Sequence, residues 1–234
     1  MSTPALPRLR TSPAVIALVV LSVPVALYAL GFAWLAPDSP FKARMMSLPQ
    51  GALPHFVGGG IALLVGGLQF SAALRARQPA LHRLLGRVYL LAVLASGLGG
   101  LALATNAHGG VSARIGFGLL ALLWLGTAMA AWRAILRHDI EAHRRWMVRS
   151  FALTFGAVML RLQLPLLQFG LGASFDDAYR TVAWLAWVPN LLVAEWWLLA
   201  HAPSIAPHAP STSPQAAEHP PAAGGAALTE AAAP

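Results

Sequence analysis

One arginine stands alone inside a long apolar stretch of this sequence. Between Arg149 and Asp176 the only charged residue is Arg161. A charge near the centre of a bilayer costs about 2.5 kcal/mol or more, so it is expected to have a partner and a function. Counted along adjacent helices from their outer ends, Asn190 lies at the depth of Arg161, and Glu195 lies about one turn deeper. We therefore predict that Glu195 and Asn190 orient Arg161, which would act as a clamp for an anion.

Four histidines lie near the ends of apolar stretches, namely His55, His82, His108 and His143. Neutral imidazoles from facing membrane helices can hold a b-type haem, and arginines can bind its propionates. Two pairs share a depth: His82 with His143 at one membrane surface, and His55 with His108 at the other. Both pairs lie at the rims of the hydrocarbon, which disfavours two stacked haems. The ligand classes that stay open are one haem, a quinone and a lipid-like molecule, and no separate metal site is predicted.

Small and polar residues follow one another in steps of four and three along three of the apolar stretches. That spacing averages about 3.5 residues, so each set lies on one face of its helix. Small residues permit close helix approach in a membrane, and hydroxyls and amides can bond across the gap. We predict that these faces meet around a polar site: His55, Gly59, Ala62, Gly66, Gln69 and Ala73; His82, Gly86, Tyr89, Val93, Ser96 and Gly100; His143, Met147, Ser150, Thr154, Ala157 and Arg161. The candidate ligand-binding residues are Arg161, Glu195, Asn190, Gln69, Tyr89 and Arg149.

The elements that would position these residues are membrane-spanning helices. Hydrophobic residues make up 57% of the chain and charged residues only 10%, whereas a soluble domain carries about 25% charged residues. Six apolar runs, near residues 13–36, 54–74, 84–105, 115–135, 148–171 and 180–200, reach the roughly 17–25 residues that a spanning helix needs. Runs without strict alternation favour helices over barrel strands. We therefore predict an all-α, polytopic six-helix transmembrane bundle over residues 13–201.

The net charge of +8 is better explained by membrane topology than by nucleic-acid binding. One side of the predicted spans holds Arg8, Arg10, Arg75, Arg77, Arg83, Arg87, Arg133, Arg137, Arg144, Arg145 and Arg149, and the other holds Lys42, Arg44, Arg114 and Arg180. Because cytoplasmic loops are enriched in lysine and arginine, this bias predicts that both termini lie in the cytoplasm. Residues 1–12 would form a short cytoplasmic segment, and residues 202–234, rich in alanine and proline, a disordered cytoplasmic tail.

Several blocks of the sequence are similar to one known family. They are His143-Arg144-Arg145-Trp146-Met147-Val148-Arg149-Ser150, His55-x3-Gly59, Leu81-His82-Arg83-x2-Gly86-Arg87-x-Tyr89 and Trp187-x2-Asn190 followed by Glu195. Over about residues 50–200 the chain resembles the predicted bacterial membrane proteins of domain-of-unknown-function family 2306. Its histidine-led helices are more distantly similar to membrane b-type cytochromes. The resemblance implies a location in the bacterial inner membrane and no particular activity. The matching positions are His55, Gln69, His82, Arg83, Tyr89, His143, Arg144, Arg145, Trp146, Arg149, Arg161, Asn190 and Glu195.

Two interpretations of function follow from these residues. In the first, four spans enclose a polar site that binds haem, a quinone or a lipid-like molecule, and His82 and His143 serve as ligands or proton carriers. In the second, the protein is a small transporter or a membrane scaffold without enzymatic activity, in which Arg161 and Glu195 form a structural ion pair. The chain has no cysteine, which excludes disulfides and thiolate metal sites in both cases.

Overall fold

Helices form almost all of the structure. The computed structural model describes residues 13–202, and this range contains helices and turns without a strand. Six of its helical segments are long and apolar enough to cross a membrane, so the prediction of an all-α protein with six spans is confirmed. The predicted N-terminal segment 1–12 and the predicted tail beyond Ala202 lie outside the described residues.

Within the described range, three spans are single helices and three are composite. The single helices are α1 (Pro13–Leu35), α5 (Pro79–Ala104) and α6 (Gly110–Leu136). The composite spans are α3 (Pro49–Gly66) with the 3-10 turn η1 (Gly67–Phe70); α7 (Ile140–Thr154) with α8 (Gly156–Pro165) and the π-helical turn η2 (Leu166–Gly170); and α9 (Phe175–Leu185) with α10 (Val188–Ala200). Two short helices, α2 (Pro40–Met46) and α4 (Ala72–Arg77), lie in the connections.

Most of the spanning helices begin several residues before the apolar runs of the sequence. Helix α9 begins at Phe175, where the hydroxyl of Ser174 accepts a hydrogen bond from the backbone N–H of Asp177. Asp139 caps α7 in the same way and accepts from the N–H of Ala142 at 2.9 Å. Helices α3 and α5 start with proline, which suits the first turn because its missing N–H has no partner there in any case. Caps and prolines therefore set the starts of α3, α5, α7 and α9.

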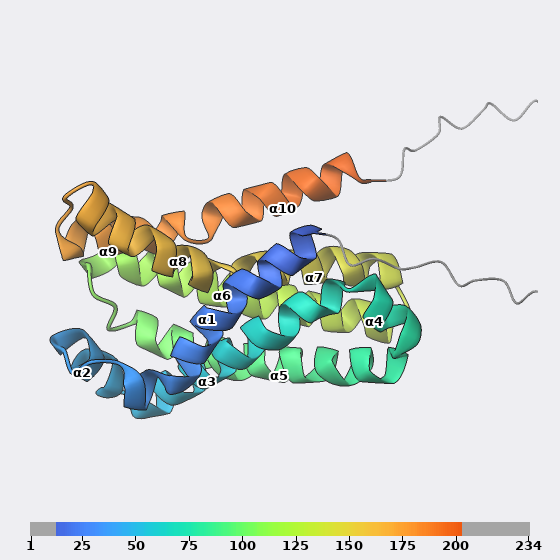
Figure 1. Cartoon of the computed structure of the whole chain (residues 1–234), viewed down its shortest axis with the longest axis horizontal. Coiled ribbons are helices and arrows are strands. Elements are labelled where there is room, and N and C mark those ends of the chain that lie inside the picture. The colour runs from blue at the N-terminus through green and yellow to red at the C-terminus, as the bar shows by residue number, and fades with distance from the viewer. Residues whose placement is uncertain (1–12, 203–234) are drawn as a thin grey trace, which may run out of the picture. The chain divides into compact units, whose positions relative to one another are not determined.

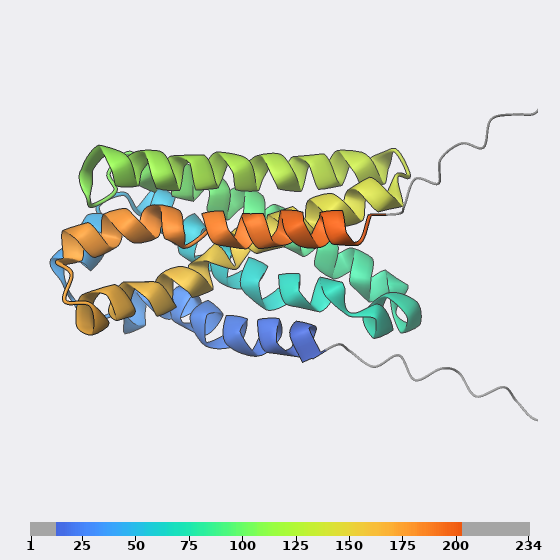
Figure 2. The ribbon, with the colours of Figure 1, turned by 90° about the horizontal axis from the view of Figure 1, so that it is seen from above.

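The helices pack mainly as sequential neighbours. Helix α3 packs against α5 and α1, α6 packs against α5 and α7, and α10 packs against α7 (Figures 1 and 2). Glycine permits the close approach of α3 and α5, because a Cβ on Gly58 would lie 2.7 Å from the carbonyl oxygen of Ala92. The predicted faces of the second and third spans also meet, since the hydroxyl of Ser96 donates to the carbonyl oxygen of His55 at 2.7 Å.

The fifth and sixth spans are both broken near their middles. Helix α7 ends at Thr154, whose hydroxyl donates to the carbonyl four residues earlier, a bond that tends to bend helices. In the sixth span, Pro189 has no N–H for the carbonyl of Leu185. That carbonyl instead accepts a hydrogen bond from the side chain of Gln163 at 3.3 Å. Each break therefore coincides with a residue that disturbs the backbone hydrogen-bond pattern of a helix.

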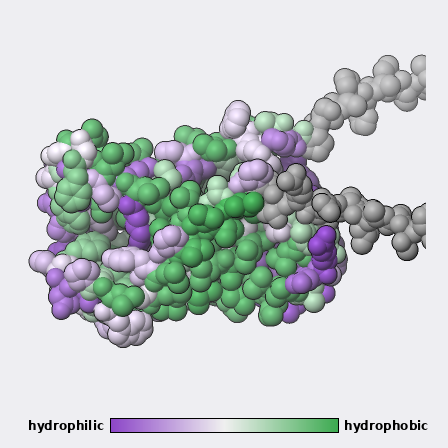
Figure 3. Space-filling view, viewed as in Figure 1, coloured by the Kyte–Doolittle hydropathy of each residue, from purple (hydrophilic) through white to green (hydrophobic). Residues whose placement is uncertain are grey.

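The surface of the bundle is suited to lipid. Figure 3 shows hydrophobic residues over the middle of the bundle and hydrophilic residues toward its two ends. Large apolar side chains are exposed on several spans, among them Leu91, Leu98, Leu122, Leu192 and Trp196. Water would penalise so much exposed apolar area, whereas hydrocarbon does not. The exposed faces are therefore those expected of helices that contact a bilayer.

Candidate functional site

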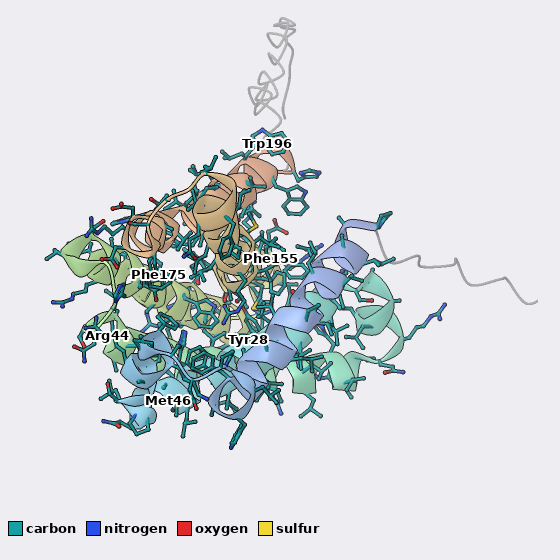
Figure 4. The ribbon with its side chains drawn as sticks, turned by 60° about the vertical axis from the view of Figure 1, so that its left-hand side comes forward. Tyr28, Arg44, Met46, Phe155, Phe175 and Trp196 are labelled. Atoms are coloured by element: carbon teal, nitrogen blue, oxygen red, sulfur yellow. The ribbon has the colours of Figure 1, made fainter. Side chains whose placement is uncertain are left out.

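Arg161 lies on α8 and is only partly satisfied by the protein around it. Its Nε–H is buried and has no hydrogen-bond partner among the described residues. One terminal nitrogen donates to the carbonyl of Ala157, one turn earlier on the same helix, at 3.3 Å. The guanidinium carbon lies 5.2 Å from the ring centre of Tyr28, within the range of a cation–π interaction. Figure 4 labels Tyr28 on α1. The guanidinium is therefore held by a ring and a weak carbonyl contact.

A cavity of about 460 Å³ opens beside Arg161. Residues from α1, α2, α3, α5, α6, α7, α8 and α9 line it, and most of them are apolar. The side chains that bring polar atoms to the wall are Tyr28, His55, Ser96, Trp124, Thr154, Arg161 and Tyr179. The volume lies within the roughly 300–1,000 Å³ of small-molecule sites, and the mixture of an apolar wall with a few polar groups is also typical of them.

Among the residues that the structure describes, no acidic residue lines this cavity. Within residues 13–202, the carboxylates are engaged elsewhere: Glu195 with Arg149, Asp176 with His108, Asp177 with Arg180, Glu141 with Arg145, and Asp38 with Lys42. Asp139 caps α7. The positive charge of Arg161 is therefore not compensated by a carboxylate of the described chain.

His55 presents a defined tautomer at the cavity wall. Its Nδ1 lies 3.0 Å from the carbonyl oxygen of Ser96. A carbonyl oxygen only accepts hydrogen bonds, so Nδ1 carries the proton, and Nε2 of the neutral ring is an acceptor. Ser96 holds the same turn of α3 through the bond from its hydroxyl to the carbonyl oxygen of His55. The imidazole is thus fixed in orientation by α5 and can accept a proton or a hydrogen bond through Nε2.

A buried network of hydroxyls closes one side of the cavity. The hydroxyl of Thr154 donates to the carbonyl of Ser150, and it accepts from Nε1 of Trp124 at 2.9 Å. The Tyr89 hydroxyl lies 2.8 Å from the hydroxyls of both Thr154 and Ser150. Since the proton of Thr154 is already used, Tyr89 donates to Thr154 and accepts from Ser150. The predicted faces of the third and fifth spans therefore meet here, and each hydroxyl has a partner.

The predicted ion pair between Arg161 and Glu195 does not form. The Glu195 carboxylate accepts two hydrogen bonds from Arg149, at 2.6 Å from Nε and 2.8 Å from a terminal nitrogen. Arg149 also lies over the ring of Trp146, 4.7 Å from its centre. The error has a physical cause: depth was counted from a sixth span that starts near residue 180, whereas α9 starts at Phe175. The earlier start places Glu195 level with Arg149 on α7.

Asn190 does not bond to Arg161 either. Its amide donates to the carbonyl oxygens of Ala186 at 2.9 Å and of Ala152 at 3.3 Å. The first of these bonds satisfies backbone at the break between α9 and α10, and the second joins that break to α7. Asn190 therefore stabilises the irregular part of the sixth span, and it does not line the cavity.

The other predicted site residues lie away from the cavity. His108 pairs with the carboxylate of Asp176, and Nδ1 of His143 bonds to the carbonyl of Ala131 at 2.9 Å. His82 has a buried Nδ1 without a partner in the described range, as does the side-chain nitrogen of Gln69. No group of three or more His, Cys, Asp or Glu residues that could hold a metal ion occurs between residues 13 and 202. Of the four candidate histidines, the structure brings only His55 to the Arg161 cavity.

The two arginine-rich connections lie at the same end of the bundle. Arg75 follows the second span, and its terminal nitrogen donates to the carbonyl of Gln69 at 2.9 Å. Burial lowers the pKa of Arg75, and the positive charge of Arg144 at the start of the fifth span lowers it further. The electrostatic effect of Arg144 requires the two connections to be close, as an even number of crossings between them also implies.

Three aromatic residues that bring a polar atom to the cavity were not predicted from the sequence. Tyr28, Trp124 and Tyr179 come from α1, α6 and α9, none of which carried one of the three predicted polar faces. Tyr179 packs among Phe41, Phe117 and Phe175, which joins α2, α6 and α9 around one ring. A single tyrosine or tryptophan in an apolar run gives no periodic signal, so only the three-dimensional arrangement identifies these residues.

Comparison with known proteins gives one match. The family model described as "Predicted membrane protein (DUF2306)" matches residues 52–198. No curated protein and no solved structure matches the chain. The matched range contains His55 and Arg161, whereas Tyr28 and Phe41, which also line the cavity, precede it.

Proposed function

The chain belongs to the predicted membrane protein family DUF2306, and from that premise we propose that it binds a quinone or a lipid-like molecule in the cavity around Arg161. The bilayer would be both its environment and the source of its ligand. Arg161 would hold the polar group of the ligand, and His55 would face the same group from α3. The apolar wall would hold the rest of the molecule.

The observation that carries this proposal is a partly satisfied arginine at the wall of an apolar cavity. Within residues 13–202, Arg161 has a buried Nε–H without a partner, and no acid of this range lines the cavity. A buried donor without a partner costs about 1–3 kcal/mol, and more when it is charged. A ligand that brings an acceptor oxygen would remove this penalty. A cationic ligand is disfavoured, because it would meet a like charge.

Haem receives less support from this cavity than a quinone or a lipid-like molecule. A haem in a helical bundle usually takes axial imidazoles from facing helices, but His55 is the one candidate histidine on the cavity wall. Its intended partner His108 has its Nε2 engaged by Asp176. The donor groups of the wall suit a carbonyl or carboxylate oxygen better than a metal.

The finer location belongs to the same proposal. We place the protein in the cytoplasmic membrane of a bacterium, with the arginine-rich end of the bundle in the cytoplasm. The closeness of Arg75 and Arg144 supports a single strongly basic end, which the positive-inside rule assigns to the cytoplasm. The cavity then opens in the half of the bundle nearer the other surface, where α2 lies.

Two variants, in each of which an alanine is replaced by leucine, test ligand binding. Ala157 lines the cavity beside Arg161, and Ala95 is exposed on α5 and does not line it. Native mass spectrometry of the protein purified in mild detergent, together with its absorption spectrum, should detect a retained small molecule. Ala157→Leu should reduce the retained ligand about tenfold or more by occupying its space, and Ala95→Leu should leave it unchanged. Equal retention in both variants would show that the ligand lies elsewhere, and a Soret band would identify haem.

A further inference from the structure

The charge of the cavity points to a narrower class of ligand. We infer that the molecule bound beside Arg161 is a single-chain amphiphile with a carboxylate head group, and not a neutral quinone or ester. This inference rests on the proposed function, because it assumes that the cavity binds a ligand. It adds the sign of the ligand's charge and the identity of its head group.

The first argument is charge balance. A guanidinium stays protonated in proteins, so Arg161 carries its charge into the membrane-spanning region. All the described acids are engaged with other residues. They include Asp176 and Asp177, the carboxylates nearest to Arg161 in the sequence. A neutral quinone could accept a hydrogen bond but would leave the charge uncompensated. A carboxylate would supply both the acceptor and the opposite charge.

The second argument is a comparison within the same span. Arg149 donates to the carboxylate of Glu195 from Nε and from a terminal nitrogen, which is the bidentate geometry that arginine and carboxylate favour. Arg161 has the same Nε–H buried and unused in the described structure. A carboxylate that enters the cavity would give the Arg161 guanidinium the kind of partner that Arg149 has in Glu195.

The third argument concerns the rest of the ligand. Apart from a few polar groups, the wall is formed by side chains such as Phe32, Leu63, Leu103, Leu160 and Leu164. A space of about 460 Å³ accommodates one apolar chain, whereas a phospholipid would have to leave its second acyl chain outside. A long-chain carboxylate matches both the charged head and the apolar wall.

The test compares two competitors, a carboxylic acid and its methyl ester, which differ in charge and by one methyl group. Purified full-length protein is loaded with dansyl-labelled undecanoate, and palmitate and methyl palmitate are titrated as competitors. Palmitate should bind about tenfold more tightly than the ester. This is the difference in affinity expected when one charge-assisted hydrogen-bond pair is lost. Equal affinity of acid and ester would overturn the inference, and this comparison needs no variant.

Variants locate the effect at Arg161. R161Q should weaken the binding of palmitate about tenfold and leave the affinity for the ester unchanged. R161K keeps the charge but loses the bidentate guanidinium, so its affinity for palmitate should lie between those of R161Q and the wild type. Arg133 is exposed at the end of α6, so R133Q serves as the matched control and should bind palmitate like the wild type. Unchanged palmitate affinity in R161Q would also overturn the inference.

The two proposals fail in different ways. If a short-chain ubiquinone and the ester compete as well as palmitate, and Ala157→Leu abolishes all three, the cavity binds ligands and only the carboxylate assignment is wrong. If none of the three probes competes and none binds directly, the proposed function is wrong as well.

Discussion

Two arginines of one span illustrate different uses of a buried charge. Arg149 is neutralised by a carboxylate of the protein and stacks on Trp146. Arg161 has no acidic partner in the described chain and faces a cavity. An ion pair that is complete within the fold leaves neither charge without a partner, whereas an uncompensated charge costs stability and persists where a ligand uses it. The first arginine is therefore structural, and the second is the candidate functional residue.

Double-mutant cycles should separate these two roles. Arg149→Met or Glu195→Met alone should destabilise the protein by about 2–3 kcal/mol, because each leaves the other charge without a partner. This is less than the roughly 3–5 kcal/mol of a fully buried pair, since the Glu195 side chain is 39% exposed. The double variant should recover most of the loss. Reversible unfolding in detergent measures all three.

Arg161→Met is the matched control for this cycle. It removes a charge that has no acid to leave behind, so the free energy of unfolding should stay the same or rise without ligand. Combined with Glu195→Met it should show no coupling. Coupling between Arg161 and Glu195 as large as that between Arg149 and Glu195 would contradict the observed pairing.

At the level of single residues, the sequence identified Arg161 as an isolated charge but not the side chains that lie beside it. Arg161 was predictable because one charge in an apolar run is a local signal. The partner of Glu195 was not, because a shift of a few residues in the start of α9 changes which side chains lie level. The hydroxyls of Tyr89, Ser150 and Thr154 were predictable as a group, since their spacing already put them on two faces that had to pack.

At the level of elements, the break in the sixth span depends on a substitute hydrogen bond. Pro189 leaves the carbonyl of Leu185 without its helical donor, and Gln163 of α8 takes that place. Gln163→Leu should therefore destabilise the protein by about 0.5–1 kcal/mol, the net value of one hydrogen bond. Chemical or thermal unfolding of the purified protein measures the loss.

The same bond can be made dispensable. In a Pro189→Ala background, the N–H of the new alanine can donate to the carbonyl of Leu185, so Gln163→Leu should cost little. An equal cost in both backgrounds would mean that Gln163 stabilises the bundle in another way.

The number of spans could be predicted because composition and run length are local properties. The exact helix starts could not be predicted from hydropathy, because they follow capping residues such as Ser174 and Asp139, which lie outside the apolar runs. The cavity could not be predicted either. Its wall combines side chains from eight helices, and no pattern within one helix encodes that combination.

At the level of the whole molecule, the proposed orientation can be tested cleanly because the chain has no cysteine. Gln78 lies exposed at the arginine-rich end between α4 and α5, and Asn106 lies exposed at the opposite end between α5 and α6. A membrane-impermeant maleimide added to spheroplasts should label Asn106→Cys and not Gln78→Cys. Both should be labelled after the membrane is permeabilised. The reverse pattern in intact spheroplasts would invert the topology.

The first helix has a consequence for how this protein could diversify. Helix α1 precedes the range that the family model matches, yet it provides the aromatic ring against which Arg161 rests. Substitutions in this one helix could alter the width and the chemistry of the cavity beside Arg161, while the remaining helices keep their packing. Substitutions in α1 alone could thus change which ligand the cavity prefers.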